Sequence, residues 1–135
     1  MLSTPLHPLV VHFPIAFLTI GALIQIISTW KKGFIEKTAW WTISLGFVTA
    51  IIAYVSGEGA EEYAEGKGTI IHSTLVVHQT LGLISLFIFG LIIGLKVFQL
   101  IKPTKFIPYL NLVLAIAGLV TIILTGYYGG KMVYI

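Results

Sequence analysis

The sequence contains no cysteine. This absence excludes disulfide bridges, thiolate metal sites, iron–sulfur clusters and the covalent attachment of a c-type haem. Charged residues are also scarce, at 10% of the 135 residues, whereas about a quarter of the residues in soluble domains are charged. All eight basic residues are lysines, most of which flank apolar runs. The net charge of +3 therefore reflects membrane topology and does not indicate binding of nucleic acid.

Apolar residues are abundant instead. They make up 57% of the chain, and the mean hydropathy is +1.00. Four runs are each long enough for a bilayer span of about 20 residues. We expect a single all-α membrane domain, a four-helix transmembrane bundle with up-down-up-down topology. The predicted helices cover residues 8–30, 38–57, 73–96 and 106–130.

The lysines predict the orientation of this bundle. Six of them lie within residues 31–37 and 96–105, the first and third connections, while Lys67 and Lys131 lie on the other side. Cytoplasmic loops carry an excess of lysine and arginine, so both termini are expected to be extracytoplasmic.

Four histidines then fall on the extracytoplasmic side: His7, His12, His72 and His78. An ionisable group at the start of a membrane span indicates a functional site. His12 and His78 each lie four to five residues inside a predicted helix, about 6 to 8 Å below its outer end. At this matched depth they are expected to face one another and to hold a metal ion or a haem iron from both sides.

Small residues lie below each of these two histidines on the same helix face. They are Ala16 and Thr19 below His12, and Gly82 and Ser85 below His78. Such strips leave space for a flat macrocycle, and we include these residues in the predicted cofactor site. The alternative is that they allow close packing of membrane helices.

An alternative metal site uses His7 and His72 together with Glu58 and Glu61, which follow the second predicted helix. Imidazole and carboxylate ligands without thiolate suit zinc, copper or iron ions. The simpler interpretation is that the two outer histidines are solvated loop residues, and that residues 58–65 form a short solvated surface helix.

Enzyme motifs are absent. The sequence has no nucleophile triad spacing, P-loop, dinucleotide fingerprint or H-E-x-x-H zinc helix. The chain is therefore expected to be an electron carrier or a binding protein and not an enzyme by itself.

The opening segment LHPLVVHFPIAF resembles the signature H-P-x-x-V-H-F-P-I of a bacterial family of four-helix membrane proteins of unknown function. SGEGAEEYAEG, VVHQTLG and GYYGGKMVY resemble later segments of the same family, so the resemblance covers nearly the whole chain. It implies a bacterial cytoplasmic (inner) membrane protein. One departure is Gln79, where glutamate is expected. The layout is also similar, more distantly, to four-helix b-type cytochromes.

These observations lead to three functional hypotheses. The first is a membrane electron-transfer module that binds one haem b between His12 and His78 and exchanges electrons with a quinone or a periplasmic redox protein. The second is a protein that binds or transports a metal ion. The third is a structural membrane subunit whose histidines only form hydrogen bonds.

Overall fold

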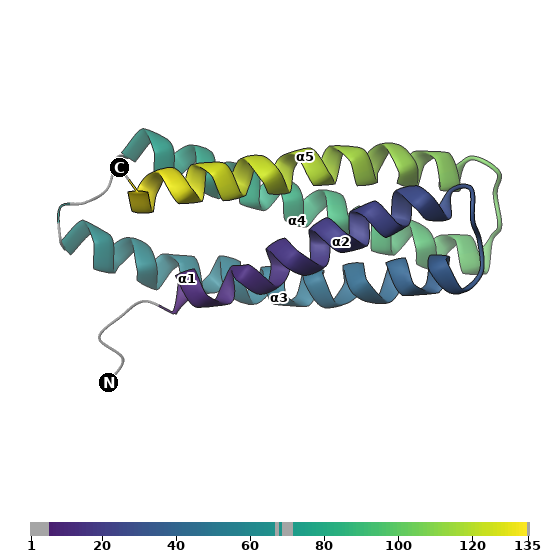
Figure 1. Cartoon of the computed structure of the whole chain (residues 1–135), viewed down its shortest axis with the longest axis horizontal. Coiled ribbons are helices and arrows are strands. Elements are labelled where there is room, and N and C mark those ends of the chain that lie inside the picture. The colour runs from purple at the N-terminus through teal and green to yellow at the C-terminus, as the bar shows by residue number, and fades with distance from the viewer. Residues whose placement is uncertain (1–5, 67, 69–71, 135) are drawn as a thin grey trace.

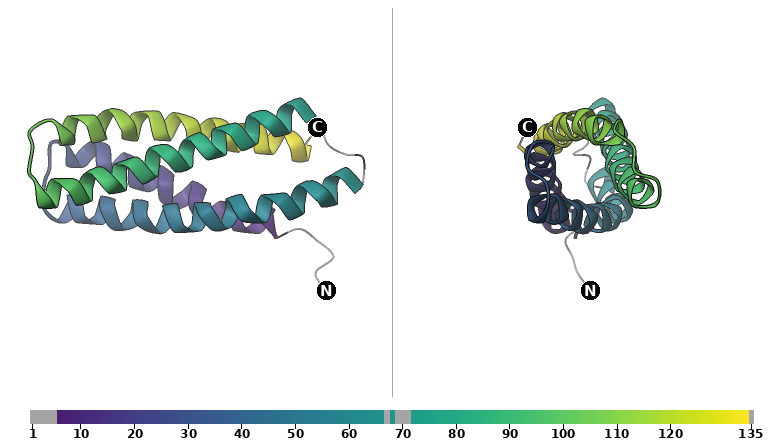
Figure 2. Two further views of the ribbon diagram at one scale, coloured as in Figure 1. Left: turned by 180° about the vertical axis from the view of Figure 1, so that it is seen from behind. Right: turned by 90° about the vertical axis from the view of Figure 1, so that its right-hand side faces the viewer.

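The computed structural model describes residues 6–66, 68 and 72–134. It contains five helices in this part of the chain and no strand. They are α1 (His7–Val10), α2 (His12–Ser28), α3 (Phe34–Gly66), α4 (His72–Ile101) and α5 (Ile107–Tyr134). Figure 1 shows the long helices running alternately up and down one axis, and Figure 2 shows them around a square when viewed end-on. The prediction of an all-α bundle with four helices able to span a membrane is confirmed.

The two ends of the bundle differ in the helix termini that they contain. The histidine end holds the starts of α1 and α4 and the ends of α3 and α5 (Figure 1). The lysine end holds the α2–α3 and α4–α5 turns, where Lys31, Lys32, Lys102 and Lys105 lie. All four spans therefore reach the histidine end and can contribute to a site there.

Helices α1 and α2 together form the first span, His7–Ser28. They are separated only at Val11, whose backbone remains in the right-handed helical region with φ −63° and ψ −20°. Pro14 has no N–H to donate to the carbonyl of Val10, so the helical hydrogen-bond pattern is interrupted here. The first span thus begins with a separate turn that carries His7.

Helix α3 extends further than the sequence analysis predicted. The prediction placed a short surface helix at residues 58–65, but α3 continues without a break to Gly66. Alanine and glutamate in this segment favour helix, and each glycine opposes it by only about 1 kcal/mol. At 1.5 Å per residue, the 33 residues of α3 span about 50 Å, more than the hydrocarbon core of about 30 Å. The acidic segment is therefore an extension of a membrane helix.

Large apolar side chains face outward on every long helix, as lipid contact requires. Examples are Leu23, Val48, Phe87 and Val113, all of which are exposed. Several polar side chains lie inside instead, including Ser85 of α4, which is 3% exposed. Because lipid is as apolar as the bundle interior, close packing and internal hydrogen bonds must hold these helices together.

Glycines provide the closest packing, between α2 and α3. A Cβ atom at Gly46 would lie 2.6 Å from Leu18 Cδ2 and 3.0 Å from the Leu18 backbone nitrogen. A Cβ atom at Gly21 would lie 2.7 Å from Ile43 Cγ1. Neither position has room for a methyl group, so these two glycines set the distance between the helices.

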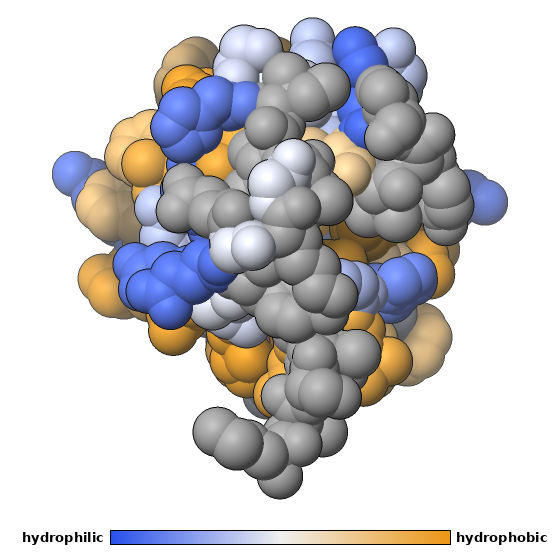
Figure 3. Space-filling model, turned by 90° about the vertical axis from the view of Figure 1, so that its left-hand side faces the viewer, coloured by the Kyte–Doolittle hydropathy of each residue, from blue (hydrophilic) through white to orange (hydrophobic). Residues whose placement is uncertain are grey.

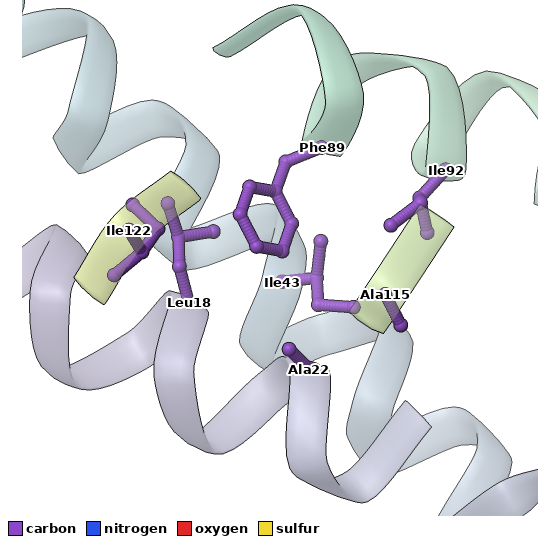
Figure 4. Close-up of a cluster of buried hydrophobic side chains, with 7 residues drawn as sticks. All are labelled: Leu18, Ala22, Ile43, Phe89, Ile92, Ala115 and Ile122. Atoms are coloured by element: carbon purple, nitrogen blue, oxygen red, sulfur yellow. The ribbon is translucent and has the colours of Figure 1, made fainter. Parts of the chain in front are cut away.

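The core lies in the middle of the bundle and is formed by all four spans (Figure 4). Its largest fully buried side chain is Phe89 of α4, which is 0% exposed. Phe89 packs on Gly118 of α5, where a Cβ atom would lie 2.8 Å from the ring. The buried cluster consists of Leu18, Ala22, Ile43, Phe89, Ile92, Ala115 and Ile122.

We expect Gly46→Ala to destabilise the bundle by about 1–3 kcal/mol, the usual effect of overpacking. The added methyl group collides with backbone as well as with a side chain, so a rotamer change cannot relieve the contact. Gly94→Ala is the matched control, because nothing lies within 4 Å of its Cβ position. Thermal unfolding in detergent should show a lower transition temperature for Gly46→Ala alone. Equal transition temperatures would mean that α2 and α3 are not packed at this distance.

Candidate functional site

A cavity of about 720 Å³ lies at the histidine end. Pockets that hold cofactors and small ligands have volumes of about 300–1,000 Å³. Every span contributes to its walls, and three of the four histidines of the chain lie on them: His7, His12 and His78. Figure 3 shows the face of the molecule at this end, where hydrophilic side chains gather, while hydrophobic side chains cover the flanks.

His7 is held against α3 by two polar contacts. Its Nδ1 atom lies 2.8 Å from the backbone oxygen of Ala53 and 3.0 Å from Ser56 Oγ. The imidazole donates its Nδ1 proton to the Ala53 carbonyl, which also accepts a hydrogen bond from the Ser56 hydroxyl at 2.8 Å. The ring lies over Gly57, where a Cβ atom would be 3.5 Å from His7 Cε1. Its Nε2 atom is the nitrogen left with a free lone pair.

His78 is held against α5 in the same way. Its Nδ1 atom donates to the backbone oxygen of Thr125 at 2.9 Å. The ring lies over Gly129, where a Cβ atom would be 3.1 Å from His78 Cε1 and 3.3 Å from Nδ1. Here too Nε2 keeps its lone pair, which is the form of imidazole that binds metals.

The two histidines therefore use one common arrangement. Each binds a helical carbonyl and lies over the glycine four residues later, Ala53 with Gly57 for His7 and Thr125 with Gly129 for His78. In a helix the Cβ atom of a residue tilts toward the N-terminus, and thus over the carbonyl four residues earlier. Glycine at that position leaves the carbonyl accessible to an imidazole from a neighbouring helix.

The rings of His7 and His78 lie next to one another across the cavity. Their centres are 6.3 Å apart and their planes form an angle of 90°. The sequence argument expected His12 in this place, on the assumption that the first and third spans begin at the same depth. The structure instead places His78, six residues inside α4, beside His7, the first residue of α1.

His12 remains on the wall of the same cavity, but its environment differs. It is exposed, and its Nδ1 atom lies 2.7 Å from the backbone oxygen of Pro8, within its own span. His72 begins α4 and is also exposed. The structure thus places the rings of His7 and His78 beside one another, with centres 6.3 Å apart, and holds each of them from a second span.

The predicted strips of small residues meet the cavity on one side only. Gly82 and Ser85 of α4 lie on its wall, but Ala16 and Thr19 are not among its lining residues. Ser85 donates a hydrogen bond to Thr121 Oγ1 at 2.9 Å. In place of the α2 strip, α5 contributes small residues that the sequence analysis did not select, Gly126, Gly129 and Gly130.

The acidic segment reaches the mouth of the cavity. Glu58 and Glu61 both lie on its wall, and Glu61 accepts a hydrogen bond of 2.8 Å from Gln79 Nε2. This contact joins α3 to α4. Over the residues with described positions, no group of three or more histidine, aspartate or glutamate side chains is close enough together to hold a metal ion.

The two glycines under the rings give a prediction with an internal control. Alanine at 129 places its methyl group 3.1 Å from the His78 ring and pushes it away from the Thr125 carbonyl, whereas alanine at 57 makes an ordinary contact of 3.5 Å with His7. Both substitutions gain the same helix propensity. Loss of one hydrogen bond should leave Gly129→Ala less stable than Gly57→Ala by about 1 kcal/mol. Chemical denaturation of both variants measures the difference, and equal stabilities would contradict the observed ring position.

Comparison with known proteins places the chain in a family. A family model described as predicted membrane protein (DUF2231) matches residues 3–135. No curated protein and no solved structure matches the chain. The family model covers nearly the whole length, and its description agrees with the four membrane-spanning helices. The chain belongs to the DUF2231 family of predicted membrane proteins.

Proposed function

We propose that this protein is a membrane electron carrier that binds one b-type haem between His7 and His78. The observation that carries this proposal is the pair of imidazole rings, each oriented by a carbonyl of another helix through Nδ1 and each keeping the Nε2 lone pair. Metal-binding histidines usually donate their second nitrogen to a carbonyl or carboxylate, which fixes the tautomer and the ring orientation.

The separation of the rings supports this assignment. Imidazole nitrogens bind metal ions at about 2 Å and lie about 1 Å from their own ring centres, so two imidazoles on opposite sides of one ion have centres about 6 Å apart. The observed separation of 6.3 Å agrees with this value. The proposal thus transfers the role predicted for His12 to His7 and keeps that of His78.

The number of ligands favours haem over a bare metal ion. A structural zinc site takes four protein ligands and a catalytic one takes three. The His7–His78 pair offers only two nitrogens, and the described part of the chain provides no cluster of three candidate ligands. Two axial ligands are sufficient for a haem iron, because the macrocycle supplies the remaining four nitrogens.

The walls of the cavity also suit a flat, largely apolar group. Small residues of α4 and α5 such as Gly82, Gly126 and Gly130 leave room beside the rings, and apolar residues such as Leu18 and Ile122 form the inner part. When bound there, haem would supply one-electron redox chemistry. The chain would provide the axial ligands, their orientation and an environment of low polarity, all of which affect the reduction potential.

With the lysine end in the cytoplasm, the haem would lie near the extracytoplasmic surface and within reach of a quinone or a periplasmic redox protein. The test is a visible absorption spectrum of the purified protein, recorded before and after addition of dithionite. We expect a Soret band, a sharp α band on reduction and about one haem per chain. Protein without these bands after expression with added haem precursor would overturn the proposal.

A further inference from the structure

A second cavity, of about 610 Å³, lies at the lysine end. It lies between the α2–α3 turn and the α4–α5 turn, at the opposite end of the bundle from the histidines. Its lining residues come from both turns and from the helix ends beside them. They are Thr29, Lys32, Gln99, Pro103, Thr104, Lys105, Pro108 and Tyr109.

The side chains of this cavity are suited to an anion. Lys32 and Lys105 approach it from different turns and bring two positive charges. Tyr109 adds a hydroxyl group, which can donate a hydrogen bond to an anion, whereas the Thr29 hydroxyl donates to the Gln25 carbonyl at 3.4 Å. Helix α5 begins beside the cavity at Ile107, so the partial positive charge of its N-terminus adds to the lysines.

One of the two turns is fixed by hydrogen bonds before any ligand binds. Gln99 Nε2 donates to the backbone oxygen of Thr104 at 3.0 Å, and the Thr104 backbone nitrogen donates to Gln99 Oε1 at 3.0 Å. This double contact connects the last turn of α4 to the residue before Lys105. The ammonium group of Lys105 is therefore attached to an ordered segment and not to a free loop.

Acidic side chains are concentrated at the other end of the molecule. Of the five glutamates in the sequence, four lie within residues 58–65 at the histidine end. The fifth, Glu36, lies in the first turn of α3 and is not on the cavity wall. Its charge acts on Lys96 of α4. Among the described residues that line this cavity with the two lysines, none carries a carboxylate.

The surroundings place this cavity at the level of lipid headgroups. Aromatic side chains at the lysine end are directed outward, with Trp30 74%, Phe106 69% and Tyr109 65% exposed. Aromatic residues of membrane proteins gather at the membrane surface, and basic pockets between membrane helices bind anionic headgroups. We propose that this cavity binds the phosphate group of an anionic phospholipid, held by Lys32 and Lys105.

Lipid binding can be measured on the purified full-length protein by native mass spectrometry with phosphatidylglycerol and with phosphatidylcholine as probes. We expect preferential retention of phosphatidylglycerol. Lys32→Gln/Lys105→Gln should weaken its binding about thirtyfold, the effect of losing two lysine contacts with an anionic headgroup. All four of these lysines are exposed, but Lys37 and Lys102 do not line the cavity, so Lys37→Gln/Lys102→Gln removes the same charge at the same end and should keep the preference.

Inorganic phosphate and glycerol phosphate form a further arm of the experiment. If neither anion displaces the lipid at millimolar concentration, the result would support recognition of a lipid. Complete displacement by one of them would overturn the proposal in favour of a free anion. Equal retention of both lipids by the unmodified protein would also overturn the proposal, and this comparison requires no variant to fold. Thermal unfolding without added lipid controls for a general loss of stability in the variants.

Discussion

Replacing His78 with alanine is expected to abolish haem binding. His78 is one of two proposed axial ligands, and His7→Ala should have the same effect because each imidazole holds one side of the iron. Changes to residues that only orient a ligand already weaken metal binding about 10- to 100-fold, so loss of the ligand itself should exceed a hundredfold. The Soret absorbance per chain, measured after purification, reports this loss.

His12→Ala is the matched control for both variants. His12 lines the same cavity but is exposed and bonded within its own span, so its removal should leave the α band and the haem content unchanged. The opposite pattern, with haem lost from His12→Ala and retained in His7→Ala, would contradict the ring pairing and favour the ligand pair predicted from the sequence alone. Circular dichroism should show the same helix content in all three variants.

The arrangement of the fold could be predicted from the sequence because it depends on composition. Long uncharged runs separated by charged turns permit little else in a bilayer, where every backbone polar group must be satisfied within a helix. Helix ends were harder to predict. Gly57 and Glu58 were interpreted as the end of a span, yet α3 continues past both to Gly66. A helix that continues beyond the membrane as a polar segment cannot be recognised from hydropathy.

Because helix ends were hard to predict, the relative depth of the histidines was hard to predict as well. The sequence analysis predicted that His12 and His78 face one another, whereas the ring beside His78 is that of His7, because the pairing depends on the relative height of α1 and α4. Helix α4 begins at His72, so His78 lies about 9 Å along it, at 1.5 Å per residue. The segments that end in His12 and His78 both read Leu-Val-Val-His, yet only the second of these histidines lies beside the His7 ring.

The two helices whose carbonyls bind the imidazoles, α3 and α5, share a sequence feature. Gly57 and Gly129 each follow, by four residues, the carbonyl that binds an imidazole. Both hairpins, α1 to α3 and α4 to α5, therefore hold one histidine in the same manner. The chain has 14 glycines, so this pattern marks accessible carbonyls, and the structure is needed to show that His7 and His78 are the histidines that reach them.

Phe89→Ala is expected to destabilise the bundle most among single core substitutions. The ring is fully buried, and large-to-small changes of this kind lower the free energy of unfolding by about 3–5 kcal/mol. The effect should fall at the lower end of this range, because the separated helices remain in lipid and the loss is mainly one of packing. Phe87→Ala on the same helix is the control, since its ring is 73% exposed and faces outward.

A double-mutant cycle with Gly118 tests the cause of this loss. A Cβ atom at position 118 would lie 2.8 Å from the Phe89 ring, so Gly118→Ala alone should destabilise the α4–α5 interface. In the Phe89→Ala background the ring is gone, and the same methyl group should instead fill part of the cavity and raise stability. Residues in contact commonly show interaction energies of about 0.5–3 kcal/mol in such cycles. Denaturant titration of the four proteins gives this energy, and additive effects would mean that the ring and the glycine are not in contact in the folded bundle.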